Sequence, residues 1–117
     1  MPRTTKVAGL NGSDLLLFEG LDCVGALRAL GEDTRVRIVG LLLEAPFGVC
    51  EIARRLGTTY YNVSKHLRIL REAGLLDVEI NGREHLYVVP ERIRRGRGAH
   101  AKVLDLGCCT FQFDQRA

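Results

Sequence analysis

The sequence lacks the features that mark several common classes of protein. No apolar run approaches the ~20 residues of a membrane span, and the N-terminus has no apolar signal-peptide core. No C-x-x-C, H-x-x-x-H or H-E-x-x-H spacing occurs, which removes the common zinc motifs. There is no phosphate-binding loop and no Cys/His pair beside an orienting acid. We therefore expect a cytoplasmic protein that does not contact membranes and is not an enzyme.

The positive charge of the chain is concentrated in one region. The 117 residues carry a net charge of +3, and many of the cations, mostly arginine, lie between Arg54 and Arg97. A local excess of arginine favours an anionic polymer as the partner. A chain of this length forms one domain with a modest core, and dimerisation would bury more apolar surface.

Residues 49–72 predict a helix-turn-helix with its turn at Gly57. In the second helix Val63, Leu67 and Leu70 recur at i, i+4 and i+7, which predicts a core-facing stripe. The opposite face carries polar and basic side chains, namely Tyr61, Lys65 and Arg68. Such a face is usually only solvated, but the preceding turn favours a DNA-binding role.

A β-hairpin is expected after this helix, because Asn81-Gly82 separates two β-rich runs. The fold class is therefore mainly α with a small β-hairpin, a dimeric winged helix-turn-helix. We expect earlier helices over 13–30, capped by Ser13, and over 33–44. After Pro90 we expect short helices to residue 95 and over 99–106, then an extended segment at 108–113. The predicted divisions are a flexible arm at 1–12, the DNA-binding domain at 13–95 and a C-terminal tail at 96–117.

With this layout in place, the chain resembles the ArsR/SmtB family of metal-responsive winged-helix repressors. The resemblance rests on residues 29–38, 49–53 and 63–75, of which the last run, VSKHLRILREAGL, is the most specific. It implies a homodimer on a palindromic double-stranded operator, which an inducer releases. Two departures are evident: His100 is the only histidine available to a C-terminal zinc site, and Cys50 alone matches the cysteine cluster of one arsenic-sensing type.

The expected DNA contacts lie on the second helix of the motif and at the hairpin tip. Tyrosine and asparagine reach base edges, whereas serine, lysine and arginine fix the register on phosphates. For Arg83 a solvated tip is almost as good an interpretation as a minor-groove contact. The candidates are Thr59, Tyr60, Tyr61, Asn62, Ser64, Lys65, Arg68 and Arg83.

The four cysteines are expected to be free thiols, because a DNA-binding chain works in a reducing compartment. Cys108 and Cys109 can turn toward one soft ion if their backbone is bent, and a third thiolate completes a site for trivalent arsenic or antimony. The third ligand is Cys50 or Cys23, within one subunit or across two. We favour Cys50, because helical phase exposes its thiol, whereas Cys23 lies on an apolar face that also suits simple packing.

The leading hypothesis is a repressor that needs no cofactor on DNA and that arsenite, antimonite or another soft ion releases. A close alternative keeps the fold but makes the cysteines a redox or persulfide switch. A third possibility is an architectural DNA-binding protein without an inducer.

Overall fold

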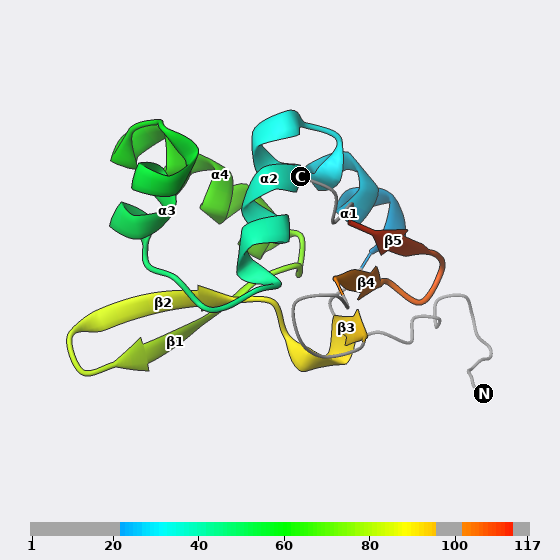
Figure 1. The fold of residues 1–117 in the computed structure, drawn as a ribbon. Helices are drawn as coiled ribbons and strands as arrows, with labels where there is room; N and C mark the ends of the chain where they lie inside the picture. The colour runs from blue at the N-terminus through cyan, green and yellow to red at the C-terminus, as the bar shows by residue number, and fades with distance from the viewer. Residues whose placement is uncertain (1–21, 96–101, 114–117) are drawn as a thin grey trace.

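The computed structural model describes residues 22–95 and 102–113 (Figure 1). Helices dominate the first part, and two small antiparallel sheets follow. The helices are α1 (Cys23–Leu30), α2 (Asp33–Leu42), α3 (Val49–Leu56) and α4 (Tyr60–Glu72), with a 3-10 turn at Glu91–Ile93. The strands are β1 (Asp77–Asn81), β2 (Glu84–Val88), β3 (Arg94–Arg95), β4 (Val103–Asp105) and β5 (Thr110–Gln112). The predicted fold class, a mainly α winged helix-turn-helix, is confirmed.

The first helix begins later than predicted. Asp22 has extended backbone angles (φ −109°, ψ 118°), and its carboxylate accepts a hydrogen bond from the Gly25 amide at 3.1 Å. This cap satisfies an amide at the start of α1 and fixes the first helical residue at Cys23. A single helix over 13–30 is therefore wrong, and the predicted cap Ser13 lies outside the described residues.

The helix-turn-helix predicted over 49–72 is confirmed in α3 and α4. Gly57 ends α3 in the left-handed conformation (φ +69°), and the Thr58 amide donates to Ala53 O at 3.0 Å. A glycine suits this position because other residues adopt a positive φ only at a cost. Thr59 then caps α4, since its hydroxyl accepts from the Asn62 amide at 3.0 Å.

The core lies where the four helices meet. Val63, Leu67 and Leu70 are at most 1% exposed, so the predicted stripe of α4 is confirmed. They belong to one cluster with Ile38 of α2 and Ile52 of α3, both fully buried. This packing fixes the opposite face of α4 outward.

The wing is the antiparallel pair β1 and β2. Asn81 pairs with Glu84, so Gly82 and Arg83 form a two-residue turn in which Gly82 has φ +66°. The left-handed angle explains why glycine occupies this position. The hairpin predicted at Asn81-Gly82 is confirmed, and Arg83 lies at its tip.

The C-terminal segment forms a second sheet in the order β3-β4-β5. The helix predicted over 99–106 is wrong, because its described part is the strand Val103–Asp105. Leu104 and Leu106 are both fully buried, and their two-residue spacing suits a strand better than a helix. The helix expected after Pro90 is reduced to the single 3-10 turn, and the extended segment predicted at 108–113 is confirmed in β5.

This sheet is attached to the end of α2. Arg94 Nη2 donates to Leu43 O at 2.7 Å, and Lys102 Nζ lies 2.8 Å from Glu44 Oε2. A methyl group added at Gly40 would lie 3.4 Å from the Phe113 ring, so the tail closely approaches α2. None of the described helices is long and apolar enough to cross a membrane.

Candidate nucleic-acid interface and cysteine cluster

The outward face of α4 and the wing form a groove of about 690 Å³. Tyr61 is 77% exposed, and Lys65 and Arg68 are exposed beside it. The predicted residues Tyr61, Ser64, Lys65 and Arg68 all line this groove, together with Arg71, Glu72 and Tyr87. Two neighbouring cations beside a tyrosine can bind phosphates and a base edge.

A second groove, of about 660 Å³, lies between α3, the start of α4 and the wing. Ser64 lines both grooves, whereas Tyr60 and Arg83 line only this one. The exposed Cys50 also faces it. The structure therefore brings the predicted wing residue and the predicted helix residues to one side of the molecule.

Thr59 and Asn62 make hydrogen bonds within the chain that the sequence analysis did not anticipate. The Thr59 hydroxyl accepts from the Asn62 backbone, and Asn62 Nδ2 donates to Thr58 Oγ1 at 3.1 Å. Each of these side chains therefore stabilises the start of α4. Contact of Thr59 and Asn62 with DNA stays a prediction. It requires each side chain to bind DNA in addition to its partner within the chain.

Arg71 and Tyr87 line the first groove but were missed. Arg71 follows Arg68 by three residues and so lies one turn further along the same helix face, a spacing that was visible in the sequence. Helical spacing gives no indication that Tyr87 lines the groove, because Tyr87 lies on β2. Its position depends on the bridge between Phe47 and Tyr87, which joins the wing to the segment before α3.

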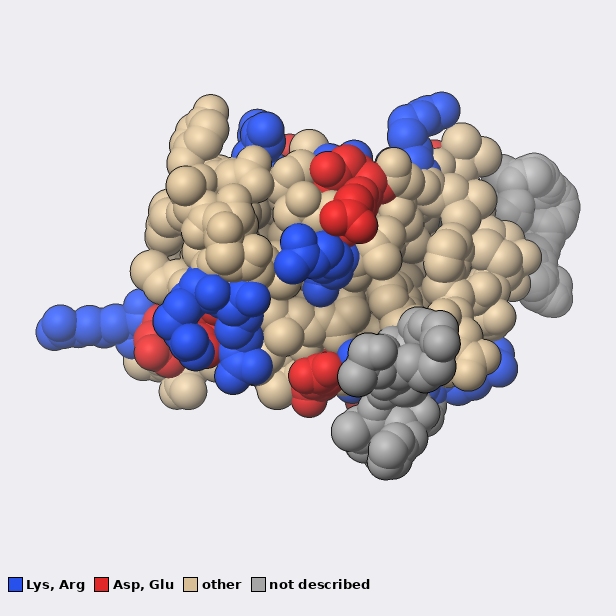
Figure 2. Space-filling model, turned by 45° about the horizontal axis from the view of Figure 1, so that its top comes forward, with Lys and Arg blue, Asp and Glu red and all other residues tan. Residues whose placement is uncertain are grey.

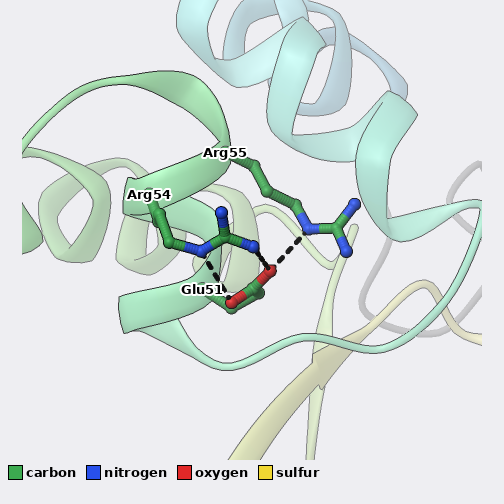
Figure 3. Close-up of polar contacts among 3 residues, drawn as sticks. All are labelled: Glu51, Arg54 and Arg55. Atoms are coloured by element: carbon green, nitrogen blue, oxygen red, sulfur yellow. Dashed lines mark hydrogen bonds and ion pairs between the residues drawn. The ribbon is translucent and has the colours of Figure 1, made fainter.

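The surface of α3 carries a local ion-pair network (Figure 3). Glu51 accepts hydrogen bonds from Arg54 Nε at 3.2 Å and from Arg55 Nε at 2.7 Å. The hydrogen bonds from Arg54 and Arg55 lower the pKa of Glu51 to about 2. Arg55 also stacks over the Phe47 ring, with Cζ 4.4 Å from the centroid. Figure 2 shows Lys and Arg side chains gathered at the end of the molecule that carries α3 and the wing.

The structure joins Cys23 and Cys108 in a disulfide, with their Cα atoms 6.5 Å apart. The expectation of four free thiols is therefore wrong for this pair. The tail folds back as β4 and β5, which brings Cys108 to the first residue of α1 across 85 positions of sequence. Cys109 Sγ lies 3.9 Å from Cys108 Sγ.

Cys108 and Cys109 can turn toward one ion only if their backbone is bent, and a bend is present between β4 and β5. Gly107 has φ +89°, and the Leu106 amide donates to Cys109 O at 2.9 Å. Cys23, Cys108 and Cys109 therefore lie together, but Cys50 does not join them. It lies on α3, at the opposite end of the molecule from β5 (Figure 1).

Within a single chain, the structure therefore brings Cys23 to Cys108 and Cys109 and leaves Cys50 apart. The identity of the third ligand stays a prediction. No group of three Cys, His, Asp or Glu side chains in residues 22–95 and 102–113 is arranged to hold a metal ion. Thiolate ligands at Cys23 and Cys108 require that this bond be reduced.

Comparisons with known proteins agree with the fold. Residues 32–78 match the model of the arsR family of bacterial regulatory proteins. Over 70 residues the chain is 43% identical to the HTH-type transcriptional repressor SmtB of Mycobacterium tuberculosis, covering 59% of this chain and 52% of that protein. It is 32% identical over 71 residues to a homolog of the cadmium resistance transcriptional regulatory protein CadC of Staphylococcus aureus, covering 60% and 59%. The chain spans between half and three fifths of the length of these relatives.

A solved structure supports the fold alone. The homodimeric winged helix-turn-helix DNA-binding domain of Mb0332 from Mycobacterium bovis, a possible ArsR-family regulator, superposes with a TM-score of 0.57. It is 24% identical, and the match covers 71% of this chain and 75% of that one.

Proposed function

Because this chain belongs to the ArsR family of bacterial regulatory proteins, we propose that it is a transcriptional repressor that binds a double-stranded operator. The observation that carries the proposal is the continuous basic and aromatic surface of α4 beside the wing. Helix α4 enters the major groove, where Lys65 and Arg68 contact phosphates and Tyr61 contacts a base edge. Arg83 extends the contact from the wing tip into the neighbouring minor groove or onto its phosphates.

The proposed repressor acts as a homodimer. Val24 and Leu27 lie three residues apart on α1 and are 59% and 41% exposed, which leaves an apolar strip open to a second copy. The Mb0332 domain, which shares this fold, is described as homodimeric. A two-fold dimer places its α4 helices about 34 Å apart, one turn of the DNA helix.

The DNA-binding proposal is tested by selecting duplexes from a random library with the full-length chain. We expect enrichment of a site with two-fold symmetry, whose half-sites are about ten base pairs apart. Enrichment of a single asymmetric half-site would contradict the dimer, and no enrichment at all would contradict sequence-specific binding.

We propose further that a thiophilic inducer releases the operator, with trivalent arsenic or antimony bound by Cys23, Cys108 and Cys109. Thiolates are the ligands that soft ions prefer, and the three sulfur atoms come from α1 and the bend between β4 and β5. The similar CadC homolog of Staphylococcus aureus is named as a cadmium resistance regulatory protein, which supports a soft ion as the signal. The site forms when Cys23 and Cys108 are reduced, and the inducer then ties the tail to α1.

The disulfide itself favours a second candidate function, a redox switch. One thiolate attacks hydrogen peroxide and becomes a sulfenic acid, with release of hydroxide. The other thiol then attacks that sulfur, so that the Cys23–Cys108 bond forms and water leaves. This mechanism requires Cys23 and Cys108 but not Cys109.

Cys109→Ser therefore separates the two candidates. With reduced protein on its selected operator, arsenite should release the wild type but not Cys109→Ser, whereas peroxide should release both if the switch is redox-driven. Cys50→Ser is the matched control and should behave as the wild type under either reagent. Unchanged operator binding in every case would favour an architectural protein without an inducer.

A further inference from the structure

His66 lies in the middle of α4, yet its side chain is buried. It is 7% exposed and is the only buried polar or charged side chain among residues 22–95 and 102–113. Its Nδ1 atom lies 3.2 Å from Arg35 Nη1. A guanidinium can only donate, so Nδ1 accepts this hydrogen bond in the neutral tautomer that carries its proton on Nε2. The same Nδ1 atom lies 4.0 Å from Glu32 Oε1. Burial, and secondarily the positive charges of Arg35 and Lys65, lower the pKa of His66 against the opposing effect of Glu32.

The same guanidinium also binds the end of α1. Arg35 Nε donates to Ala29 O at 2.6 Å. Ala29 lies in the last turn of α1, where carbonyl groups have no partner within the helix. The Arg35 amide donates to Glu32 Oε1 at 3.0 Å, which fixes the arginine at the start of α2. Arg35 therefore joins the C-terminal end of α1 to the DNA-binding helix.

The other end of α1 is Cys23, the first residue of that helix. An eight-residue helix is a stiff element about 12 Å long, so a displacement at Cys23 also moves the Ala29 carbonyl. The described contacts thus form a continuous path from Cys108 to α4, through the disulfide, helix α1 and the two bonds of Arg35. Coupling between two sites requires a structural element that connects them and that can adopt two distinct arrangements.

We propose that Arg35 is the positioning residue that couples the state of Cys23 and Cys108 to the orientation of α4, with His66 as its acceptor. The inference rests on the proposed function, since α4 is taken as the DNA-binding helix. Closing or opening the contact between α1 and the tail shifts the Ala29 carbonyl, and the guanidinium transfers this shift to His66. The angle of α4 relative to the wing then changes, and this change alters the affinity for DNA.

The test uses the full-length chain in a Cys50→Ser, Cys109→Ser background, in which Cys23 and Cys108 are the only thiols. Operator affinity is measured for the reduced and the disulfide form, and their ratio is the readout. Arg35→Lys retains the charge but cannot make both bonds, and His66→Leu removes the acceptor. His66→Gln is the matched control, because its amide oxygen can still accept from Arg35.

We expect a ratio of about fivefold or more in the background chain and in His66→Gln, and a ratio within about twofold in Arg35→Lys and His66→Leu. Thermal melts of the four proteins check folding, and the His66 pair carries the test if Arg35→Lys is unfolded. The proposal would be overturned if the affinity ratio in His66→Leu equalled that of the background chain. It would also be overturned if the two forms of the background chain had equal affinities.

A second readout needs no DNA. The ¹⁵N signals of the His66 ring should differ between the reduced and disulfide forms in the background chain, and this difference should shrink in Arg35→Lys. Identical ring signals in both forms would refute the coupling even if the operator is bound. Conversely, a shift of the ring signals without any operator binding would refute the proposed function and leave the coupling intact.

Discussion

Phe47 and Tyr87 exchange two backbone hydrogen bonds, of 3.3 Å from the Phe47 amide and 2.9 Å from the Tyr87 amide. This bridge fastens the wing to the segment that leads into α3. Because Tyr87 lines both grooves, the wing is held at a fixed position relative to the outward face of α4. The two predicted DNA-contacting elements therefore form one surface.

Loss of a phosphate contact should be visible in the salt dependence of binding. We expect Lys65→Ala and Arg68→Ala each to weaken operator binding and to reduce the slope of log K against log salt by about one. Arg95→Ala is the matched control, because Arg95 is an exposed cation that pairs with Asp105 in the C-terminal sheet. Titrations at several salt concentrations check this, and equal slopes for Lys65→Ala and Arg95→Ala would contradict the proposed binding face.

The turn of the helix-turn-helix depends on glycine for its backbone angle. Gly57 has φ +69° and an added methyl group would meet no atom within 4 Å, so Gly57→Ala tests conformation alone. We expect a loss of about 1 to 2 kcal/mol in the free energy of unfolding, measured by denaturant titration. Gly31→Ala is the control: Gly31 has φ −82°, and this change should be neutral or slightly stabilising. Similar effects at both positions would argue against this explanation.

The ion pairs of Glu51 predict a specific pH dependence. Its pKa is lowered from 4.5 to about 2 in the folded chain, so its contribution to stability is complete above about pH 4.5 and is lost as the pH falls toward 2. Glu51→Gln should therefore lower the melting temperature at pH 6, and by less at pH 3. Added salt should also reduce the difference, because the group is exposed. Glu79→Gln, an exposed acid on the wing, serves as the control, and a Glu51→Gln effect that is equal at both pH values would contradict the interpretation.

The apolar strip of α1 predicts the behaviour of the dimer. Leu27→Glu places a charge in the proposed interface and should shift sedimentation at micromolar concentration from dimer to monomer, with little change in folding. Leu27→Met keeps the strip apolar and should remain dimeric. If Leu27→Glu sediments as the wild type does, the interface lies elsewhere.

The elements that the sequence predicted correctly depend on local signals. The turn at Gly57 and the hairpin at Asn81-Gly82 each follow from the backbone angles that glycine adopts. The buried stripe of α4 follows from its helical period, and the exposed position of Lys65 and Arg68 follows from that stripe. For these reasons the candidate DNA surface could be assigned before the fold was known.

The missed features depend on contacts between distant residues. The run Val103 to Leu106 is too short for its period to decide between helix and strand, and its pairing with β3 and β5 determines the outcome. The association of Cys23 with Cys108 requires the tail to fold back against α1. No local pattern in the sequence encodes that return.

In the proposed mechanism, chemistry at the cysteines of α1 and the tail controls the DNA affinity of α4. The most direct measurement is the fluorescence anisotropy of a labelled operator bound by the reduced full-length chain, as arsenite is added. This mechanism predicts that arsenite lowers the anisotropy to that of free DNA for the wild type and for Cys50→Ser, while Cys108→Ser stays bound. Release of Cys108→Ser at the same arsenite concentration as the wild type would contradict it.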